Sequence, residues 1–118
     1  MSTTVTDFRA FAQAMENRDT DGLLQWYRPD ATLTLHDRDH PPATPRVISG
    51  IDEIAEYLRD VCGRAMEHDV RDLVVTEDRL AYTEYCHYPD GTYVVCVAMA
   101  HLSDGLIAEQ TGVQAWDD

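Results

Sequence analysis

The residue in this sequence best suited to chemistry is Glu84, which falls in the middle of a strand-like run from Leu80 to Tyr88. Side chains alternate along a strand, so Tyr82, Glu84 and Cys86 share one face. Burial among apolar neighbours disfavours the charged form of a carboxylate, and such a group suits general acid–base catalysis. We therefore take Glu84 as the candidate acid or base.

Hydroxyl and amide groups elsewhere in the chain could orient a substrate beside it. Tyr57 flanks the apolar stripe of a predicted helix, and Tyr82 shares the strand of Glu84, so either phenol could donate to a substrate oxygen. Gln110 and Gln114 carry polar groups that need partners, and a ligand is one possibility. The competing interpretations are that the tyrosines pack in the core, and that Glu84 points the other way or bonds to Tyr57 or Gln110 for structural reasons.

The sequence contains no convincing metal or nucleophile motif. Residues 36–40 (HDRDH) look like a metal cluster but lack a third ligand at a suitable distance, so a solvated loop, or a pocket mouth where His36 or Asp37 touches a ligand, is the better interpretation. Cys86 has no evident base beside it, which argues against nucleophilic catalysis. His68 and His101 could carry protons near neutral pH, or be solvated or bonded structurally. We predict neither a metal nor a cofactor.

Two hairpins must position these residues. Strand-like runs over 80–88, 92–102 and 106–116 are separated by Pro89-Asp90-Gly91 and Ser103-Asp104-Gly105, and Asp-Gly favours a two-residue type I′ turn. Such turns place Val97 opposite Glu84 and Gly112, and Met99 opposite Tyr82 and Gln110. One face would then carry Tyr82, Glu84, Cys86, Val97, Met99, Gln110, Gly112 and Gln114. Cys86 and Cys96 would lie on opposite faces.

The rest of the chain predicts helices and two more strands. Apolar spacing indicates helices over about 6–16, 20–27 and 49–66, with Pro29 ending the second and Ser49 capping the third. Residues 31–36 alternate as a strand, residues 68–76 are predicted to form a strand of mixed pattern, and 37–46 form a loop. Helices gathered on one face of a curved antiparallel sheet make an α+β fold.

Composition limits the partners. The 118 residues hold 22 acidic side chains and nine Arg with no Lys, a net charge of −13, so we expect no nucleic acid and no anionic membrane as a partner. There is no 20-residue apolar run and no signal-peptide pattern, which predicts a cytoplasmic protein. Three Cys without a paired motif predict free thiols. Both faces of the sheet are largely apolar, so we expect helices on one and a second subunit on the other, as a homodimer.

Three segments carry a family resemblance: residues 17–33 (NRDTDGLLQWYRPDATL), 48–54 (ISGIDEI) and 103–107 (SDGLI). In this order and spacing they resemble the nuclear transport factor 2-like superfamily, and within it the SnoaL-like polyketide cyclase branch. The resemblance spans nearly the whole chain, which is then a single domain over residues 1–118. It implies a cone-shaped, cystatin-like roll: a curved antiparallel sheet with three helices packed on its concave face.

The resemblance also implies which residues line the cone. The third, fifth and seventh positions after Ile107 face the pocket in these proteins, and here they are Gln110, Gly112 and Gln114. Taken with the hairpin register, the catalytic candidates are Glu84, Tyr57 and Tyr82. The expected substrate-binding residues are Gln110, Gln114, Val97, Met99, Leu35, Phe11, Cys86 and Trp26.

Several chemistries known for this fold lack their residues in this chain. Ketosteroid isomerases have a general-base Asp where this chain has Leu35, an oxyanion Tyr where it has Phe11, and a second acid near Val97. Limonene epoxide hydrolases have an Asp on the last strand where this chain has Gly112. SnoaL-type cyclases rely on one acid in the cone, and Glu84 offers an acid at a different place.

The resulting hypothesis is a small-molecule pocket protein. It would be a cofactor-independent cyclase, isomerase or hydrolase-type enzyme that acts on a small apolar metabolite of polyketide or terpenoid type, with Glu84 as acid and base. The alternative is a non-catalytic ligand-binding or dimeric accessory protein of the same fold. A third possibility is a cone filled by its own side chains.

Overall fold

The chain folds around one strongly curved sheet of six strands, seen in a computed structural model that describes residues 5–117 and the side chains of residues 8–117. The strands are β1 (Tyr27–His36), β2 (Arg46–Ser49), β3 (Glu67–Val75), β4 (Arg79–His87), β5 (Tyr93–Ser103) and β6 (Leu106–Trp116). Their order across the sheet is β2-β1-β6-β5-β4-β3. Only the β1–β6 pair among them is parallel, so the sheet is mixed rather than wholly antiparallel.

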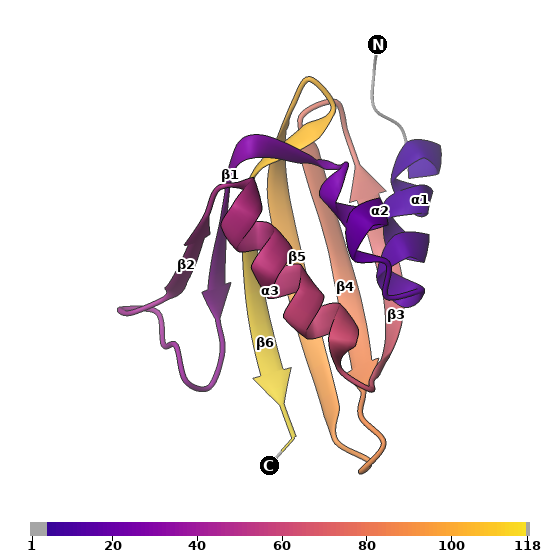
Figure 1. Ribbon diagram of the computed structural model, residues 1–118, viewed down its shortest axis with the longest axis vertical. Coiled ribbons are helices and arrows are strands. Elements are labelled where there is room, and N and C mark those ends of the chain that lie inside the picture. The colour runs from indigo at the N-terminus through magenta and orange to yellow at the C-terminus, as the bar shows by residue number, and fades with distance from the viewer. Residues whose placement is uncertain (1–4, 118) are drawn as a thin grey trace.

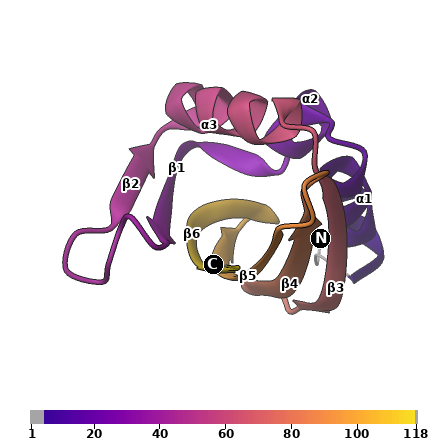
Figure 2. The ribbon, with the colours of Figure 1, turned by 90° about the horizontal axis from the view of Figure 1, so that it is seen from below.

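Three helices lie on the concave side: α1 (Val5–Glu16), α2 (Thr20–Leu24) and α3 (Ile51–Gly63). Figure 1 shows α3 crossing the sheet diagonally, and Figure 2 shows the strands curling beneath it with α1 beside β3. Ile54 and Leu58 of α3 and Phe8 and Phe11 of α1 are buried against the sheet. Each contributes about 1.5–3 kcal/mol by leaving water. The predicted α+β, cone-shaped architecture is confirmed.

Up to the end of α3, the chain departs from the prediction at three places. Tyr27 begins β1 instead of ending a helix, and Pro29, which lacks a backbone N–H, falls where the pairing of β1 with β6 is interrupted. The predicted loop after β1 ends at Arg46, where the short strand β2 pairs back onto β1. Helix α3 also ends at Gly63, before the predicted Met66.

The β4–β5 turn has one residue more than predicted. The Tyr88 N–H donates to the Thr92 carbonyl at 2.9 Å, and only Gly91 in the turn has a positive φ, of 93°. The loop is therefore three residues long, a hairpin type that places Gly at the left-handed position. Glu84 consequently pairs with Cys96 instead of Val97.

The β5–β6 turn is the predicted type, but a bulge follows it. Asp104 and Gly105 both have positive φ, and Ser103 pairs with Leu106 as expected. The register then shifts between His101 and Leu102, so that His101 pairs with Glu109. The side chains of β6 therefore point to the predicted faces of the sheet, and only those of β5 point to the face opposite to the predicted one.

The inverted β5 corrects three expectations. Val97 and Met99 point outward, with 53% and 59% of their surface exposed, so neither can contact a ligand in the cone. Val94, Ala98 and Ala100 take the inward positions. Cys96 shares the inner face with Cys86, contrary to prediction, although all three cysteines are free thiols as expected.

Across the described residues, no helix is both long enough and apolar enough to cross a membrane.

Candidate functional site

A cavity of about 290 Å³ lies inside the cone, at the lower end of the range for ligand pockets. Its walls come from the concave face of the sheet, from α3 and from the loop that follows β1. Because this space exists, the cone is not filled by its own side chains. The exposed members of the lining, Arg38, Asp39 and Arg46, mark its mouth.

Most of the predicted site residues line this cavity. The structure brings together seven of them there: Glu84, Tyr57, Tyr82, Gln110, Gln114, Leu35 and Cys86. Val97 and Met99 are on the outer face, as described above. Of the loop residues predicted at a pocket mouth, Asp37 lines the cavity and His36 does not.

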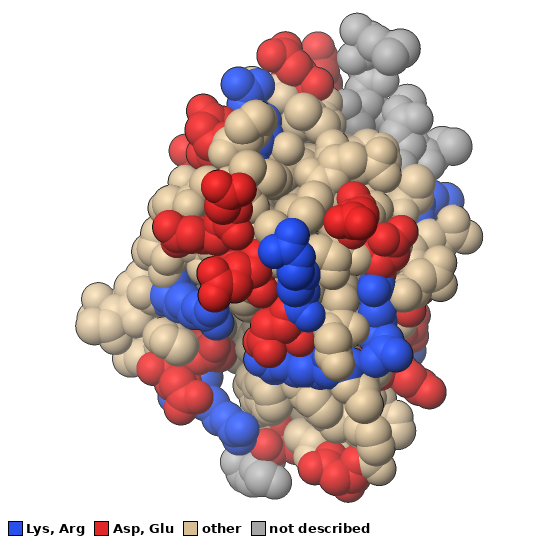
Figure 3. All heavy atoms as spheres, viewed as in Figure 1, with Lys and Arg blue, Asp and Glu red and all other residues tan. Residues whose placement is uncertain are grey.

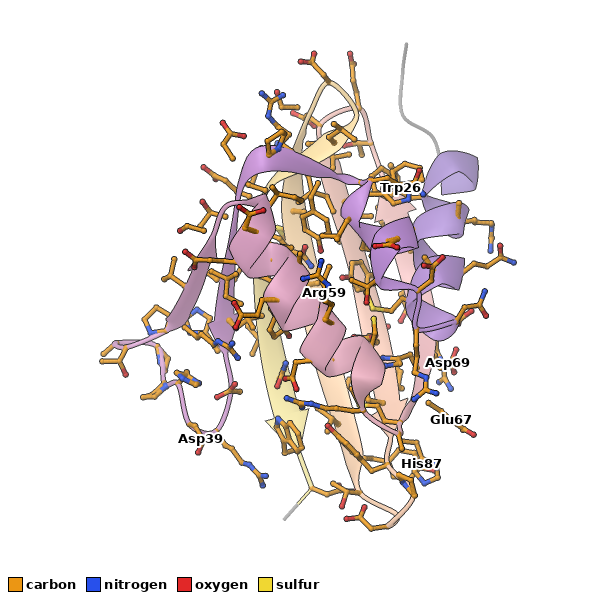
Figure 4. All side chains as sticks on the ribbon, in the orientation of Figure 1. Trp26, Asp39, Arg59, Glu67, Asp69 and His87 are labelled. Carbon is orange, nitrogen blue, oxygen red and sulfur yellow. The ribbon has the colours of Figure 1, made fainter. Side chains whose placement is uncertain are left out.

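Phe11 and Trp26 also lie outside the cavity lining. Phe11 is wholly buried, with its ring centroid 5.7 Å from that of Tyr82, so it supports the cavity wall from behind. The Trp26 ring packs on Phe8 at 4.7 Å. Figure 4 shows Trp26 beside α2 and far from Asp39 in the loop after β1. These two aromatic residues belong to the core under the helices.

Glu84 is buried and bonded to a histidine that the sequence did not single out as its partner. The His68 Nδ1 lies 2.8 Å from the Glu84 Oε2, and the two side chains are 1% and 11% exposed. The pairing of β3 with β4 brings them together, because His68 lies opposite Cys86, two residues from Glu84. The Nε2 of His68 has no hydrogen-bond partner among the described residues. The signal available in the sequence was the position of His68 at the start of the strand next to Glu84.

A second group of buried polar atoms lies deeper in the cone. The Gln110 Nε2 donates to the Tyr82 hydroxyl at 3.0 Å, and the Tyr27 hydroxyl donates to the Gln110 Oε1 at 2.8 Å. Burial raises the pKa of Tyr27 and of Tyr82 well above the usual value, so both phenols stay protonated. Because the Tyr82 oxygen accepts from Gln110, its own hydrogen is free to be donated into the cavity.

Tyr57 faces this group from α3. Burial raises its pKa above the ordinary value, so it too is a neutral hydrogen-bond donor. Its ring also lies under the guanidinium of Arg46, at 5.2 Å from the centroid. Tyr57 is the one predicted catalytic candidate contributed by a helix, and it places a phenol on the cavity wall formed by α3.

The two inward-facing thiols are poor nucleophiles. Burial raises the pKa of Cys96 to about 12 and that of Cys86 further, so both thiols are protonated at neutral pH. The Cys86 Sγ lies 3.6 Å from the His68 Nδ1, and the nearby Glu84 carboxylate adds to the raised pKa of the thiol. These contacts make Cys86 a neighbour of the Glu84–His68 pair.

The same three side chains could hold a metal ion. The ligand atoms of His68, Glu84 and Cys86 lie within 4.8 Å of one another, and imidazole, carboxylate and thiolate are all zinc ligands. The loop first considered for a metal is arranged differently. There the Asp37 Oδ1 lies 2.8 Å from the His40 Nδ1 and accepts the Asp39 N–H at 2.9 Å.

Cationic groups gather at the mouth. Arg38 lies over the Trp116 ring at 4.6 Å, and Arg64 pairs with Asp60 and donates to the Tyr88 hydroxyl. On the face that carries α3, Figure 3 shows most basic side chains over the middle and lower part of the molecule, among acidic ones. No pattern in the sequence indicates the arginines of the cavity lining, because Arg38, Arg46 and Arg64 come from three separate segments that only the fold brings together.

Comparisons with known proteins agree with this architecture. An NTF2-like protein of unknown function from Mesorhizobium loti matches with a TM-score of 0.79 and 17% identity over 92% of this chain and 87% of that one. A putative ketosteroid isomerase from Kribbella flavida gives 0.75 and 17% over 93% and 74%. A loop-truncation variant of IdmH gives 0.69 and 23% over 94% and 92%. At these identities the likeness shows the fold alone.

No curated protein matches the chain significantly. The family model described as the SnoaL-like domain matches residues 8–110, which is most of the chain. The chain therefore belongs to the SnoaL-like domain family.

Proposed function

We propose that this protein is an enzyme that moves a proton on a small, largely apolar molecule held in the cone, with Glu84 as the acid and base. The observation that carries the proposal is the carboxylate–imidazole pair of Glu84 and His68, buried in the wall of a cavity. Ionisable pairs of this kind are costly to bury and cluster at functional sites. The reaction class is a cofactor-independent isomerisation, cyclisation or hydrolysis.

The contacts of each residue support a division of roles. His68 donates from Nδ1 to the carboxylate and so fixes its orientation, while the other carboxylate oxygen is available to take a proton from the substrate. Negative charge that develops on a substrate oxygen would be stabilised by the neutral hydroxyls of Tyr82 and Tyr57. Gln110 holds the Tyr82 hydroxyl in place. The proton taken by Glu84 returns to the substrate or passes to water.

Ketosteroid isomerase chemistry of the familiar kind is not part of the proposal. The positions of its three functional groups are occupied by Leu35, Phe11 and Val97, and the last two do not reach the cavity. The alternative is a non-catalytic ligand-binding or accessory protein. The cavity favours that alternative as much as it favours catalysis, whereas the buried Glu84–His68 pair supports catalysis.

The test is proton exchange at carbon. Small cyclic ketones are incubated with the parent protein in deuterated water and followed by NMR. The protein should catalyse the exchange of hydrogen for deuterium at the carbon next to the carbonyl. Glu84→Gln should lose about 10²–10⁴-fold in rate while it still binds the ketone, since a general base contributes that much. Glu109→Gln removes the same charge from the outer face of the sheet and should not change the rate.

Two outcomes would contradict the proposal. Binding of the ketones without exchange in the parent protein would favour the ligand-binding alternative. Exchange that disappears after dialysis against a chelator and returns with Zn²⁺ would make His68, Glu84 and Cys86 metal ligands.

A further inference from the structure

Two arginines at the mouth of the cavity have no acidic partner among the described side chains. Arg38 and Arg46 line the cavity and are exposed. Among the side chains of residues 8–117, neither guanidinium has a carboxylate oxygen within 4.0 Å. Four other arginines do form such pairs, namely Arg28, Arg64, Arg71 and Arg79, whereas Arg9, Arg18 and Arg59 form none with these side chains.

Aromatic rings hold both groups in place. The Arg38 Cζ is 4.6 Å from the centroid of Trp116, and the Arg46 Cζ is 5.2 Å from that of Tyr57. Stacking on a ring orients a guanidinium without using its N–H donors. The donors are therefore left for a ligand at the mouth, and both supporting rings are themselves part of the cavity lining.

The acidic groups at the mouth do not neutralise these arginines, although the protein is strongly acidic, with 22 acidic residues against nine arginines. The acidic neighbour Asp37 is engaged by His40 and by the Asp39 N–H, while Asp39 itself is exposed. Two guanidinium groups without a carboxylate partner among residues 8–117 thus border one opening in a protein of net charge −13.

The buried part of the cavity has the opposite preference. Glu84 is buried there beside His68, and a ligand anion placed next to the carboxylate would be repelled. The lining also includes the apolar side chains of Leu33, Leu35, Leu58 and Val94. A ligand with one charged end would therefore lie with that end at the mouth.

We propose that the cavity binds an organic anion: a small apolar molecule whose carboxylate is held by Arg38 and Arg46, with its uncharged end toward Glu84 and His68. Guanidinium groups match carboxylates through paired N–H donors. The inference rests on the proposed function for what happens at the inner end, but anion binding at the mouth does not require catalysis.

Matched probes test the charge preference. Calorimetry should show that 2-naphthoate binds at least about fivefold more tightly than the neutral 2-naphthalenemethanol, a difference of about 1 kcal/mol. In the double variant Arg38→Gln/Arg46→Gln the two probes should bind equally. Raising the salt concentration should weaken only the naphthoate, since exposed charges are screened.

Arg59→Gln is the matched control. Arg59 lies exposed on α3, as Figure 4 shows, and does not line the cavity, so the variant removes a positive charge away from the mouth and should keep the preference. Equal affinity of the parent for both probes, an equal loss in Arg59→Gln, or no binding of either probe would overturn the inference. Glu84→Gln should retain the naphthoate preference, so failure of the catalytic proposal and failure of the anion site are separate results.

Discussion

The buried pair of Glu84 and His68 is formed by side chains of two neighbouring strands, β4 and β3. Alternation along β4 was enough to place the carboxylate on the same face as Tyr82 and Cys86, and the structure buries all three. His68 required the pairing of β3 with β4, which depends on the bulge between Arg71 and Val74. No local pattern in the sequence specifies such a bulge, so the acid was found and its partner in the pair was not.

The first prediction concerns the energetics of this pair. His68→Ala should lower the free energy of unfolding by about 3 kcal/mol, because it leaves a buried carboxylate without its partner. Adding Glu84→Gln should recover part of the loss, since the neutral amide is cheaper to bury. Urea denaturation of the two single variants and the double variant measures the coupling. Strictly additive losses would show that the two groups do not interact.

At the scale of the elements, the sequence predicts most helices and strands and their order, but it does not predict the register of the hairpins. The resemblance and the apolar periodicity were sufficient for α1, α3 and the order of the last four strands. The register was not, because Asp90-Gly91 and Asp104-Gly105 look alike yet form a three-residue and a two-residue loop. One extra loop residue moves every side chain of the following strand to the other face of the sheet. The predicted inward positions of β5 were therefore wrong.

The second prediction follows from the β4–β5 turn. Gly91→Ala should cost about 1 kcal/mol of stability, because a φ of 93° is unfavourable for alanine. No atom lies within 4 Å of the new methyl group, so this backbone strain is the whole expected cost. Gly63→Ala at the end of α3 also has open space but no positive φ, so it should be neutral or stabilising. Thermal denaturation compares the two, and equal effects would exclude the assigned turn conformation.

At the scale of the whole molecule, the buried phenols make the free energy of unfolding fall at alkaline pH. Tyr27 and Tyr82 have folded pKa values raised by burial, while unfolded tyrosines ionise near pH 10. Their contribution is fully present below about pH 10 and is lost as the pH rises further, because the unfolded state then releases protons that the folded state retains.

The third prediction is therefore a fall in the melting temperature above about pH 10. Tyr82→Phe should start from a lower stability, since Gln110 loses a partner, but its decline with pH should be shallower. Tyr85→Phe, on the exposed face, should decline as steeply as the parent. A Tyr82→Phe slope equal to that of the parent would contradict the assigned burial of this phenol.

The convex face of the sheet leads to the fourth prediction. Large apolar side chains are exposed there on neighbouring strands, among them Tyr85, Val97, Met99 and Val113. We propose that a second copy of the chain covers this face, as the sequence suggested, although it was expected to use other β5 residues. Val97→Glu should convert a dimer to a monomer by light scattering, and Val47→Glu on β2 should not. A parent protein that is monomeric would refute this.

The most direct test of the account is whether Glu84 acts as a base inside the cavity. The probe is 5-nitrobenzisoxazole, a small apolar molecule whose C–H proton is removed by a base as its N–O bond breaks, releasing a coloured phenolate. The account predicts catalysed release by the parent and by Glu109→Gln, and a loss of at least about 10²-fold in Glu84→Gln. Equal rates in the parent and Glu84→Gln would contradict it.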